Sequence, residues 1–416
     1  MARFISVYLL DGGFASQLER NGHHIPETNS IWSSIYLITD PKSVVEVHKQ
    51  FIAAGSDIIT TNTYQASIKG FYETSHFNSR QALDSIDLAV KLAERAIHET
   101  GCLRSNKTYE NQNKLDILNQ QNNHNLQINQ KINTEKTHDY NLLTFKKIIM
   151  IAGSVGPYGA SLCDQSEYSN IYLENVTQIF LKEWHRPRIV QLLDSGVDIL
   201  ACETIPCIKE ALAIAELLKE LSFAFKYKDI KAWFSFTIRS NLENNEENVA
   251  RHMISSGEPF IKAYDILSIY PQVIAMGVNC VHPGLIEPLL CEIASHRLIV
   301  KNNYFDHESG KGVGKEVRSI NALKMTNNFK TIKFSSPNCP ALIVYPNRGE
   351  IWDPMNKKWR NADKNQLPLS GYLNKWVELG ATYIGGCCRV YKEDIQQMRG
   401  VIDTYFKTCI TNNSDM

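Results

Sequence analysis

Two adjacent cysteines near the C-terminal end of the chain have the spacing to hold a metal ion. Cys387 and Cys388 follow Gly385 and Gly386 at the end of a short apolar run. Because neighbouring side chains on a strand point to opposite faces, the two sulfurs can converge only where the strand has ended. Glycines permit the sharp turn that this requires, since they adopt backbone dihedrals that a side chain forbids. We therefore expect both sulfurs to face one point.

A third thiolate is available at Cys280, which ends another apolar run, Gly277 to Cys280. Three thiolates suit zinc, and a zinc ion with three protein ligands keeps its fourth tetrahedral position for water or substrate. The pattern thus favours a catalytic zinc site formed by Cys280, Cys387 and Cys388. Two alternatives stay open from these residues alone: a disulfide between Cys387 and Cys388, or plain buried thiols.

The composition of the chain limits the classes of partner. The chain has 416 residues, 43% of them hydrophobic, which is enough for a sizeable core in one large barrel or in two or three domains. Lys plus Arg and Asp plus Glu number 44 each, so no excess of charge indicates a nucleic acid or an anionic membrane as partner. We expect small-molecule substrates, and nothing in the sequence indicates an oligomeric state.

Cysteine usage and the N-terminal residues bear on the compartment. Ten cysteines at irregular spacing favour a reducing compartment and free thiols. The apolar run over residues 4–10 is short and leads directly into Asp11-Gly12-Gly13, which is typical of a first strand rather than of a signal peptide. No run of residues is long enough to span a bilayer. We expect a cytoplasmic protein.

Short β-branched or apolar runs alternate with stretches of helical period along the whole chain. Eight strand-helix units in strict alternation predict an α/β fold, a (β/α)₈ barrel of the TIM type, with an open doubly wound sheet as the alternative. The expected strands cover residues 7–10, 57–61, 148–152, 197–202, 232–236, 273–278, 341–345 and 382–384. The expected helices cover residues 43–54, 79–99, 176–193, 209–221, 259–269, 285–295, 369–379 and 392–406.

Two segments do not fit the alternation. Residues 103–146 are rich in Asn and Gln with little apolar periodicity, so they cannot bury enough surface to offset the entropy of ordering. Residues 301–338 are polar and rich in Gly, Lys and Asn. Both lie between a helix and the next strand, which is the face of a barrel away from its chemistry. We expect one barrel domain over residues 1–408, interrupted by these two segments and followed by a tail at 409–416.

Unusual polar residues fall at the ends of the expected strands. In a barrel these ends share one rim, where active sites of this fold are built, and the predicted zinc site belongs to the same rim. Taken singly, each residue has an ordinary explanation such as a turn, a cap or a core thiol. Taken together they favour an active site. The set consists of Asp11, Thr61, Gly153, Ser154, Glu203, Asn279, Cys280, Tyr345, Asn347, Cys387 and Cys388.

Eight strings of the sequence resemble the homocysteine S-methyltransferases. The resemblance covers nearly the whole chain apart from the two interrupting segments and the tail, and GVNC followed by GGCC is highly specific to the family. Ser16, Ser34 and the Asn/Gln-rich insertion depart from the family pattern, and none of them touches an expected zinc ligand. The strings are LLDGGFASQLE (9–19), TTNTYQAS (60–67), AGSVGPYGA (152–160), CETIP (202–206), SGEPF (256–260), GVNC (277–280), VYPNRGEIWD (344–353) and GGCCR (385–389).

The resemblance implies a zinc-dependent methyltransferase with one Zn²⁺ per chain. Its branch uses S-methylmethionine or S-adenosylmethionine to methylate the thiolate of L-homocysteine, which forms methionine. Alternatives within the family are selenohomocysteine or selenocysteine as acceptor, and betaine as donor. The leaving thioether needs no proton, so we expect no catalytic residue beyond the zinc-bound substrate thiolate.

The resemblance also assigns roles to rim residues. Asp11 and Glu203 are expected to bind the ammonium group of homocysteine with help from Thr61, and Gly12 and Asn279 complete the substrate-binding set. Three aromatic residues are candidates to contact the cationic sulfonium through their ring faces or to form a lid. Ordinary packing at the barrel mouth is the alternative for each of them. These residues are Trp32, Tyr64 and Tyr345.

Two other classes of protein remain as alternatives. A glycoside hydrolase on the same barrel would use Asp11 and Glu203 as its carboxylate pair, which leaves the three cysteines unexplained. A non-catalytic zinc protein would need a fourth protein ligand such as His282 or Cys163 to close the site.

Overall fold

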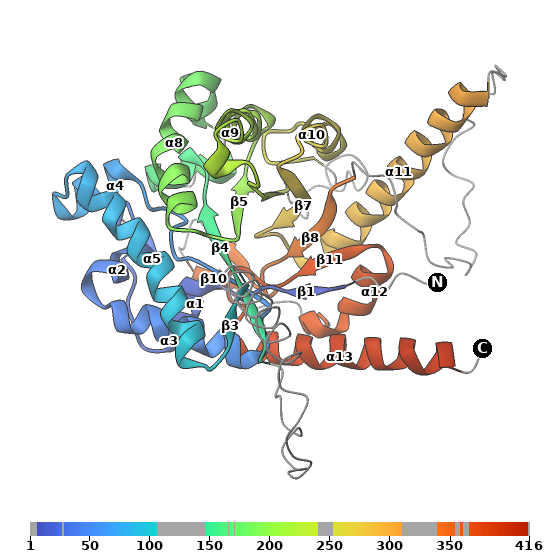
Figure 1. Ribbon diagram of the computed structural model, residues 1–416, viewed down its shortest axis with the longest axis horizontal. Coiled ribbons are helices and arrows are strands. Elements are labelled where there is room, and N and C mark those ends of the chain that lie inside the picture. The colour runs from blue at the N-terminus through green and yellow to red at the C-terminus, as the bar shows by residue number, and fades with distance from the viewer. Residues whose placement is uncertain are drawn as a thin grey trace, which may run out of the picture.

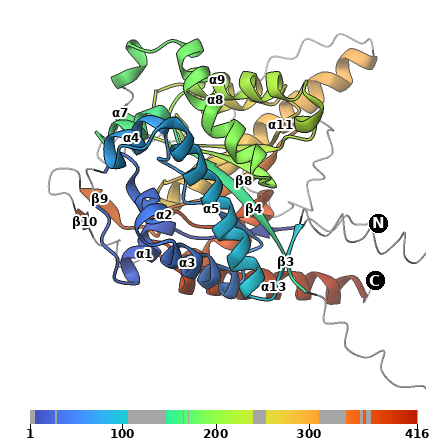
Figure 2. The same cartoon turned by 60° about the vertical axis from the view of Figure 1, so that its left-hand side comes forward.

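Parallel strands surrounded by helices form the body of the protein (Figures 1 and 2). The computed structural model describes residues 6–26, 29–105, 146–164, 166–169, 171–239, 253–309, 339–353, 358–360 and 366–414. The central sheet has the order β1-β11-β8-β7-β6-β5-β4-β2, and a parallel bridge between Leu10 and Ile58 joins its two ends. The predicted (β/α)₈ barrel is confirmed. Its strands are β1 (Tyr8–Leu9), β2 (Ile58–Thr60), β4 (Ile148–Val155), β5 (Ile199–Ile205), β6 (Ala232–Phe236), β7 (Val273–Asn279), β8 (Ala341–Tyr345) and β11 (Ala381–Ile384).

Helices surround the barrel on its outside, and the N-terminal residues of several of them are capped. Asp40 accepts a hydrogen bond from the amide of Ser43 at the start of α3, and Asn78 and Gln81 cap α5 reciprocally. Gly55 ends α3 with a φ of 110°. The α-helices are α1 (Phe14–Arg20), α2 (Tyr36–Thr39), α3 (Pro41–Ala54), α4 (Ile68–Ser75), α5 (Ser79–Glu99), α7 (Ser166–Ser169), α8 (Gln178–Asp194), α9 (Ile208–Leu221), α10 (Phe260–Leu267), α11 (Ile286–Ser309), α12 (Leu373–Glu378) and α13 (Lys392–Ser414).

The strands separate two apolar layers. Side chains that alternate along each strand pack either outward against the helices or inward into the barrel. The inward layer includes Ile58, Ala152, Ala201 and Trp233. Two residues further along each of these strands the inward position is polar. These polar positions are Thr60, Ser154, Glu203 and Ser235. The alternation therefore places a polar layer directly above an apolar barrel interior.

The structure extends the ordered parts beyond the sequence prediction at three places. A short strand, β3 (Leu103–Arg104), pairs with β4, so the start of the predicted insertion is ordered. Helix α11 continues to Ser309, because the sequence contains no Gly or Pro between 297 and 309 to stop it. Helix α13 covers residues 409–414 of the predicted tail. The rest of the segments 103–146 and 301–338 lies outside the described residues.

Two further features complete the fold. The antiparallel strands β9 (Ile351–Asp353) and β10 (Lys358–Arg360), which the sequence did not predict, form a separate two-stranded sheet after β8. None of the helices in the described ranges combines the length and the apolar character that crossing a bilayer requires.

Candidate metal centre and active site

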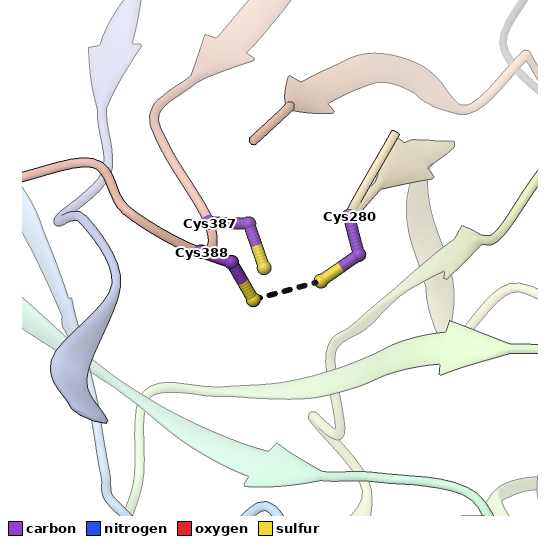
Figure 3. Close-up of side chains that lie close together, drawn as sticks. All are labelled: Cys280, Cys387 and Cys388. Carbon is purple, nitrogen blue, oxygen red and sulfur yellow. Dashed lines mark hydrogen bonds between the residues drawn. The ribbon is translucent and has the colours of Figure 1, made fainter. Parts of the chain in front are cut away.

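The three predicted ligand cysteines lie together at the C-terminal ends of β7 and β11. Cys387 and Cys388 come from the loop after β11, Cys280 follows β7, and the three sulfurs point toward one another (Figure 3). The Sγ atoms of Cys280 and Cys388 are 3.8 Å apart, and all three sulfurs lie within 4.8 Å of one another. All three are free thiols, so the alternative of a disulfide between Cys387 and Cys388 is not what the structure shows.

The segment 346–348 after β8 holds both cysteine loops in place. The amide of Cys387 donates to the carbonyl oxygen of Pro346 at 2.7 Å, and the amide of Arg348 donates to that of Cys388 at 3.1 Å. Between them, the amide of Asn347 donates to the carbonyl oxygen of Val281 at 2.9 Å. Backbone groups of one short segment thus bind the loops that carry Cys280 and the cysteine pair.

The sulfur arrangement fits a tetrahedral zinc ion. Zn–S bonds of about 2.3 Å in tetrahedral geometry place sulfurs about 3.8 Å apart, which is the observed spacing of Cys280 and Cys388. Hydrogen bonds from Cys280 and Cys387 lower the pKa of Cys388, whereas the hydrogen bonds with Cys387 and Cys388 raise the pKa of Cys280. Among the protein groups alone, the cluster therefore stabilises one thiolate, and a divalent cation would be needed to hold three.

No fourth protein ligand joins the cluster within the described ranges. In that part of the chain, Cys280, Cys387 and Cys388 form the only group of three or more His, Cys, Asp or Glu residues whose ligand atoms lie close enough together to share a metal ion. His282 instead accepts a hydrogen bond from the amide of Gly284 at 3.2 Å, and Cys163 contacts Asn29 and Gln65. A site with three protein ligands leaves a position open for a substrate atom.

Asp11 and Gly12 lie against the loop that carries the cysteine pair. The amide of Gly386 donates to the carbonyl oxygen of Asp11 at 3.0 Å. A Cβ atom on Gly12 would lie 2.5 Å from the carbonyl oxygen of Val390, closer than real Cβ atoms approach. Glycine at position 12 is thus required by close backbone contact. The structure gives Gly12 this packing role, and a contact with substrate stays a prediction.

The carboxylate of Asp11 is fixed by Thr60. Its Oδ2 accepts from the amide of Thr60 at 2.7 Å, and its Oδ1 accepts from the Thr60 hydroxyl at 2.9 Å. Burial raises the pKa of Asp11 to about 7, and the nearby charge of Glu203 contributes to the shift. A cationic group bound between the two carboxylates would favour their charged forms.

Glu203 lies at the same level on β5. The hydroxyl of Ser154 donates to its Oε1, and Tyr345 also hydrogen-bonds its carboxylate. Burial raises the pKa of Glu203 to about 7. The carboxylates of Asp11 and Glu203 therefore lie close enough to interact at the barrel mouth near the cysteine cluster, in a setting that suits an ammonium ion.

Thr61 and Asn279 bind protein groups in the structure. The hydroxyl of Thr61 lies 2.8 Å from that of Thr63 and accepts from the amide of Ser154 at 3.0 Å. The side chain of Asn279 is fully buried and binds Thr204. The structure supplies protein partners for both side chains, and their predicted contacts with substrate stay predictions.

The three predicted aromatic residues differ in their surroundings. The rings of Trp32 and Tyr64 meet edge to face with centroids 6.3 Å apart. Burial raises the pKa of Tyr64, and Glu167 and Cys280 lie near enough to raise it further. Tyr345 is 5% exposed, and its hydroxyl binds the indole N–H of Trp233 at 3.1 Å. Tyr64 is therefore placed near Cys280 with Trp32 packed on its ring, and Tyr345 lies near both Glu203 and Cys387.

Sequence reasoning missed several residues of the site. Thr60, rather than Thr61, contacts Asp11, and the inward alternation along β2 from Ile58 would have identified it. Tyr168 on α7 is partly exposed and lies near enough to Cys280 for this thiol to contribute to a raised pKa of its phenol. No pattern in the sequence points to Tyr168, because the loop after β4 is irregular.

Comparisons with known proteins agree with this geometry. The sequence profile of the homocysteine S-methyltransferase family matches residues 8–402. Selenocysteine Se-methyltransferase of Brassica oleracea var. italica is 32% identical over 382 residues, covering 92% of this chain and 84% of the relative. Betaine-homocysteine S-methyltransferase of Drosophila melanogaster is 29% identical over 401 residues, covering 94% of this chain and 93% of the relative.

A solved structure shares the fold and a good part of the sequence. The crystal structure of the homocysteine methyltransferase MmuM from Escherichia coli, in its metallated form, superposes with a TM-score of 0.61 at 28% identity, covering 95% of this chain and 96% of the other. Fold and site together define a barrel methyltransferase with a three-cysteine centre. The chain belongs to the homocysteine S-methyltransferase family.

Proposed function

We propose that this protein transfers a methyl group from a sulfonium donor to the sulfur of L-homocysteine and forms methionine. The observation that carries the proposal is the meeting of three free cysteine sulfurs with two carboxylates, buried Asp11 and half-buried Glu203, at one end of the barrel. The three sulfurs would hold a soft metal ion that binds the thiol of homocysteine, and the two carboxylates would bind its ammonium group at the same barrel mouth. The glycoside hydrolase alternative uses the carboxylates and gives the cysteines no role.

The chemistry needs alignment of two substrates rather than proton transfer. A zinc ion held by Cys280, Cys387 and Cys388 would lower the pKa of the homocysteine thiol and keep its sulfur nucleophilic near neutral pH. The new S–C bond forms on homocysteine as the bond to the sulfonium sulfur breaks, and the electron pair stays on the leaving thioether. The protein orients the attacking substrate through the carboxylates of Asp11 and Glu203.

The methyl donor is proposed to lie on the side of Trp32 and Tyr64. The ring of Tyr64 lies near Cys280 and packs against that of Trp32, so the pair offers ring faces to a cationic sulfonium, an interaction of about 2 kcal/mol when desolvated. S-Methylmethionine and S-adenosylmethionine both carry that charge. Betaine carries it on nitrogen, and the Drosophila relative bears that donor in its name, so overall similarity does not choose among the three.

A selenium acceptor is the second candidate substrate. The Brassica relative is named as a selenocysteine Se-methyltransferase, and a selenolate binds zinc and attacks a methyl group as a thiolate does.

The free thiols among the described cysteines also support our inference of a reducing, cytoplasmic location.

A methyl-transfer assay tests the proposal. Purified protein with its zinc content measured is given homocysteine with S-methylmethionine, S-adenosylmethionine or betaine, and methionine is quantified. Selenocysteine replaces homocysteine in a parallel series. We expect methionine formation with a sulfonium donor and its loss after metal chelation. A zinc-loaded protein that is inactive with all three donors would contradict the proposal.

A further inference from the structure

A strained residue follows Glu203 at the end of β5. Thr204 has a φ of 61°, in the left-handed region that β-branched residues rarely enter. Here the register between β5 and β6 shifts: Cys202 pairs with Phe234 but Ile205 pairs with Phe236, so two residues of β5 stand opposite one of β6. This is a β-bulge, a device that redirects a side chain at the end of a strand. Glu203, the other residue of the bulge, carries the carboxylate that faces the proposed homocysteine site.

Asn279 on β7, the strand beyond β6, binds the residue at this bulge. Its Oδ1 accepts from the amide of Thr204 at 2.8 Å, and its Nδ2 donates to the hydroxyl of Thr204 at 2.8 Å. The side chain of Asn279 is completely buried. Both ends of its amide are thus bound to Thr204, whose backbone is strained.

The same amide reaches the cysteine cluster. Asn279 Nδ2 lies 3.8 Å from the Sγ of Cys387, within reach of an N–H···S hydrogen bond. Cys280 is the next residue along the chain and takes a φ of 53° as the strand ends. One side chain therefore contacts the strained bulge and a proposed metal ligand at the same time.

We propose that Asn279 is a positioning residue that holds Thr204 in its left-handed conformation, and thereby aims Glu203 at the substrate and orients Cys387. The inference rests on the proposed function. It replaces the expectation that Asn279 contacts substrate, because its carbonyl oxygen and its N–H groups already have protein partners. Asn279 would couple the ammonium end of the site to its sulfur end.

A double-mutant cycle with Thr204→Gly separates positioning from substrate contact. Glycine adopts a positive φ without strain, so the bulge of the Thr204→Gly protein should keep its shape without Asn279. In the parent, Asn279→Ala should weaken homocysteine binding roughly ten- to a hundred-fold, the value of a misplaced charge-assisted bond. In the Thr204→Gly background the same change should cost no more than about threefold. Binding is measured by calorimetry on the zinc-loaded proteins.

Thr204→Ser is the matched control. Serine keeps the amide and the hydroxyl that Asn279 binds, and it still resists a positive φ, so its background should stay sensitive to Asn279→Ala. An equal loss of affinity in the parent and in the Thr204→Gly background would show that Asn279 does not act through the conformation of residue 204 and would overturn the proposal. Serine behaving like glycine would overturn it as well, because the conformation of residue 204 would then not matter.

Cobalt substitution supplies a readout that a purely structural role would not move. Asn279→Ala and Asn279→Asp both remove the N–H donor to Cys387, so both should shift the sulfur-to-cobalt charge-transfer band. Asn279→Asp still keeps an oxygen that can accept from the amide of Thr204. Thr204→Gly should leave that band in place, and an unshifted band in both Asn279 variants would contradict the contact with Cys387. A parent that binds cobalt but no homocysteine would refute the proposed function. The cobalt spectra and the unfolding free energies would then test the positioning role. Asn279→Ala must lower the unfolding free energy more in the parent protein than in the Thr204→Gly background.

Discussion

The guanidinium of Arg188 donates a hydrogen bond to the carbonyl oxygen of Tyr64 at 3.1 Å. It also donates to the carbonyl oxygen of Gly156 at 2.6 Å and to Nδ1 of His185 at 2.9 Å. The Nε2–H of His185 in turn donates to Glu210 at 2.8 Å. Burial lowers the pKa of His185, so the ring is neutral and this tautomer follows from its two partners. A buried charged network thus holds the backbone that carries Tyr64 beside the cysteine cluster.

Replacing Arg188 should be strongly destabilising. Arg188→Ala removes the buried cation that is linked to Glu210 through His185. It also removes the donor to the carbonyl oxygen of Gly156 and one of the two donors to the carbonyl oxygen of Tyr64, and the whole loss costs roughly 3–5 kcal/mol of unfolding free energy. Arg186 lies on the same helix, and its ion pairs with Glu183 and Glu220 are partly exposed, so Arg186→Ala should cost less than about 1 kcal/mol. Urea unfolding of both variants measures the two losses of unfolding free energy. Similar losses for the two would mean that the buried network adds nothing specific.

The metal should depend on each of the three cysteines. Single changes of Cys280, Cys387 or Cys388 to Ser should remove most of the zinc and nearly all activity, because a hydroxyl is a poor substitute for a thiolate. Elemental analysis measures the zinc. Cys163→Ser, at an exposed cysteine outside the cluster, should keep full zinc. A fully zinc-loaded Cys280→Ser protein would show that a different group is the third ligand.

The charge of Glu203 should act on the amino group of homocysteine. Glu203→Gln keeps the size of the side chain and removes its charge, so homocysteine should bind roughly ten- to a hundred-fold more weakly, from about 1.5 to 3 kcal/mol. Zinc content should match the parent. The thiol 4-mercaptobutyrate lacks the amino group and should lose little further in the variant. Steady-state kinetics with both thiols tests this, and equal losses would give Glu203 another role.

Protonation of His48 should destabilise the fold in acid. Burial lowers the pKa of His48 to about 3 from 6.5, and its ring packs on Phe14. His48 therefore binds a proton in the unfolded chain but stays neutral in the folded chain. The unfolding free energy falls by about 1.4 kcal/mol per pH unit as the pH falls from about 6.5 toward 3. His48→Phe should remove this part of the pH dependence, measured as the difference in unfolding free energy between pH 7 and pH 5. His98→Phe, at an exposed position, should not change the slope.

Deleting most of the Asn/Gln-rich segment should leave catalysis nearly intact. The amide of Leu103 donates to the carbonyl oxygen of Lys147 at 2.9 Å, so the chain enters and leaves the segment at neighbouring points. These points lie at the start of β4, at the barrel end opposite the cysteines. A protein in which a short Gly/Ser bridge replaces residues 106–142 should keep turnover within a few-fold of the parent. A large loss in a protein that still melts cooperatively would show that the segment reaches the site.

The site was partly readable from alternation alone. Where a strand presents a small or branched apolar residue inward, the residue two positions later is also inward, and this rule places Ser154 and Glu203 in one layer. The same rule would have chosen Thr60 over Thr61. It fails at Thr204, because a bulge breaks the period of two, and a threonine gives no warning that its φ is positive.

The sequence by itself determined the barrel, the family and the three cysteines. The periods of strands and helices are properties of short stretches of sequence, and the GVNC and GGCC strings are short and contiguous, so all of them can be recognised without the structure. Only the tertiary structure decided which neighbours those residues meet: Thr60 on Asp11, Asn279 on Thr204, and residues 346–348 between the two cysteine loops. The first two of these contacts join residues that are 49 and 75 positions apart along the chain. They depend on strand register and backbone conformation, which local residue preferences do not specify.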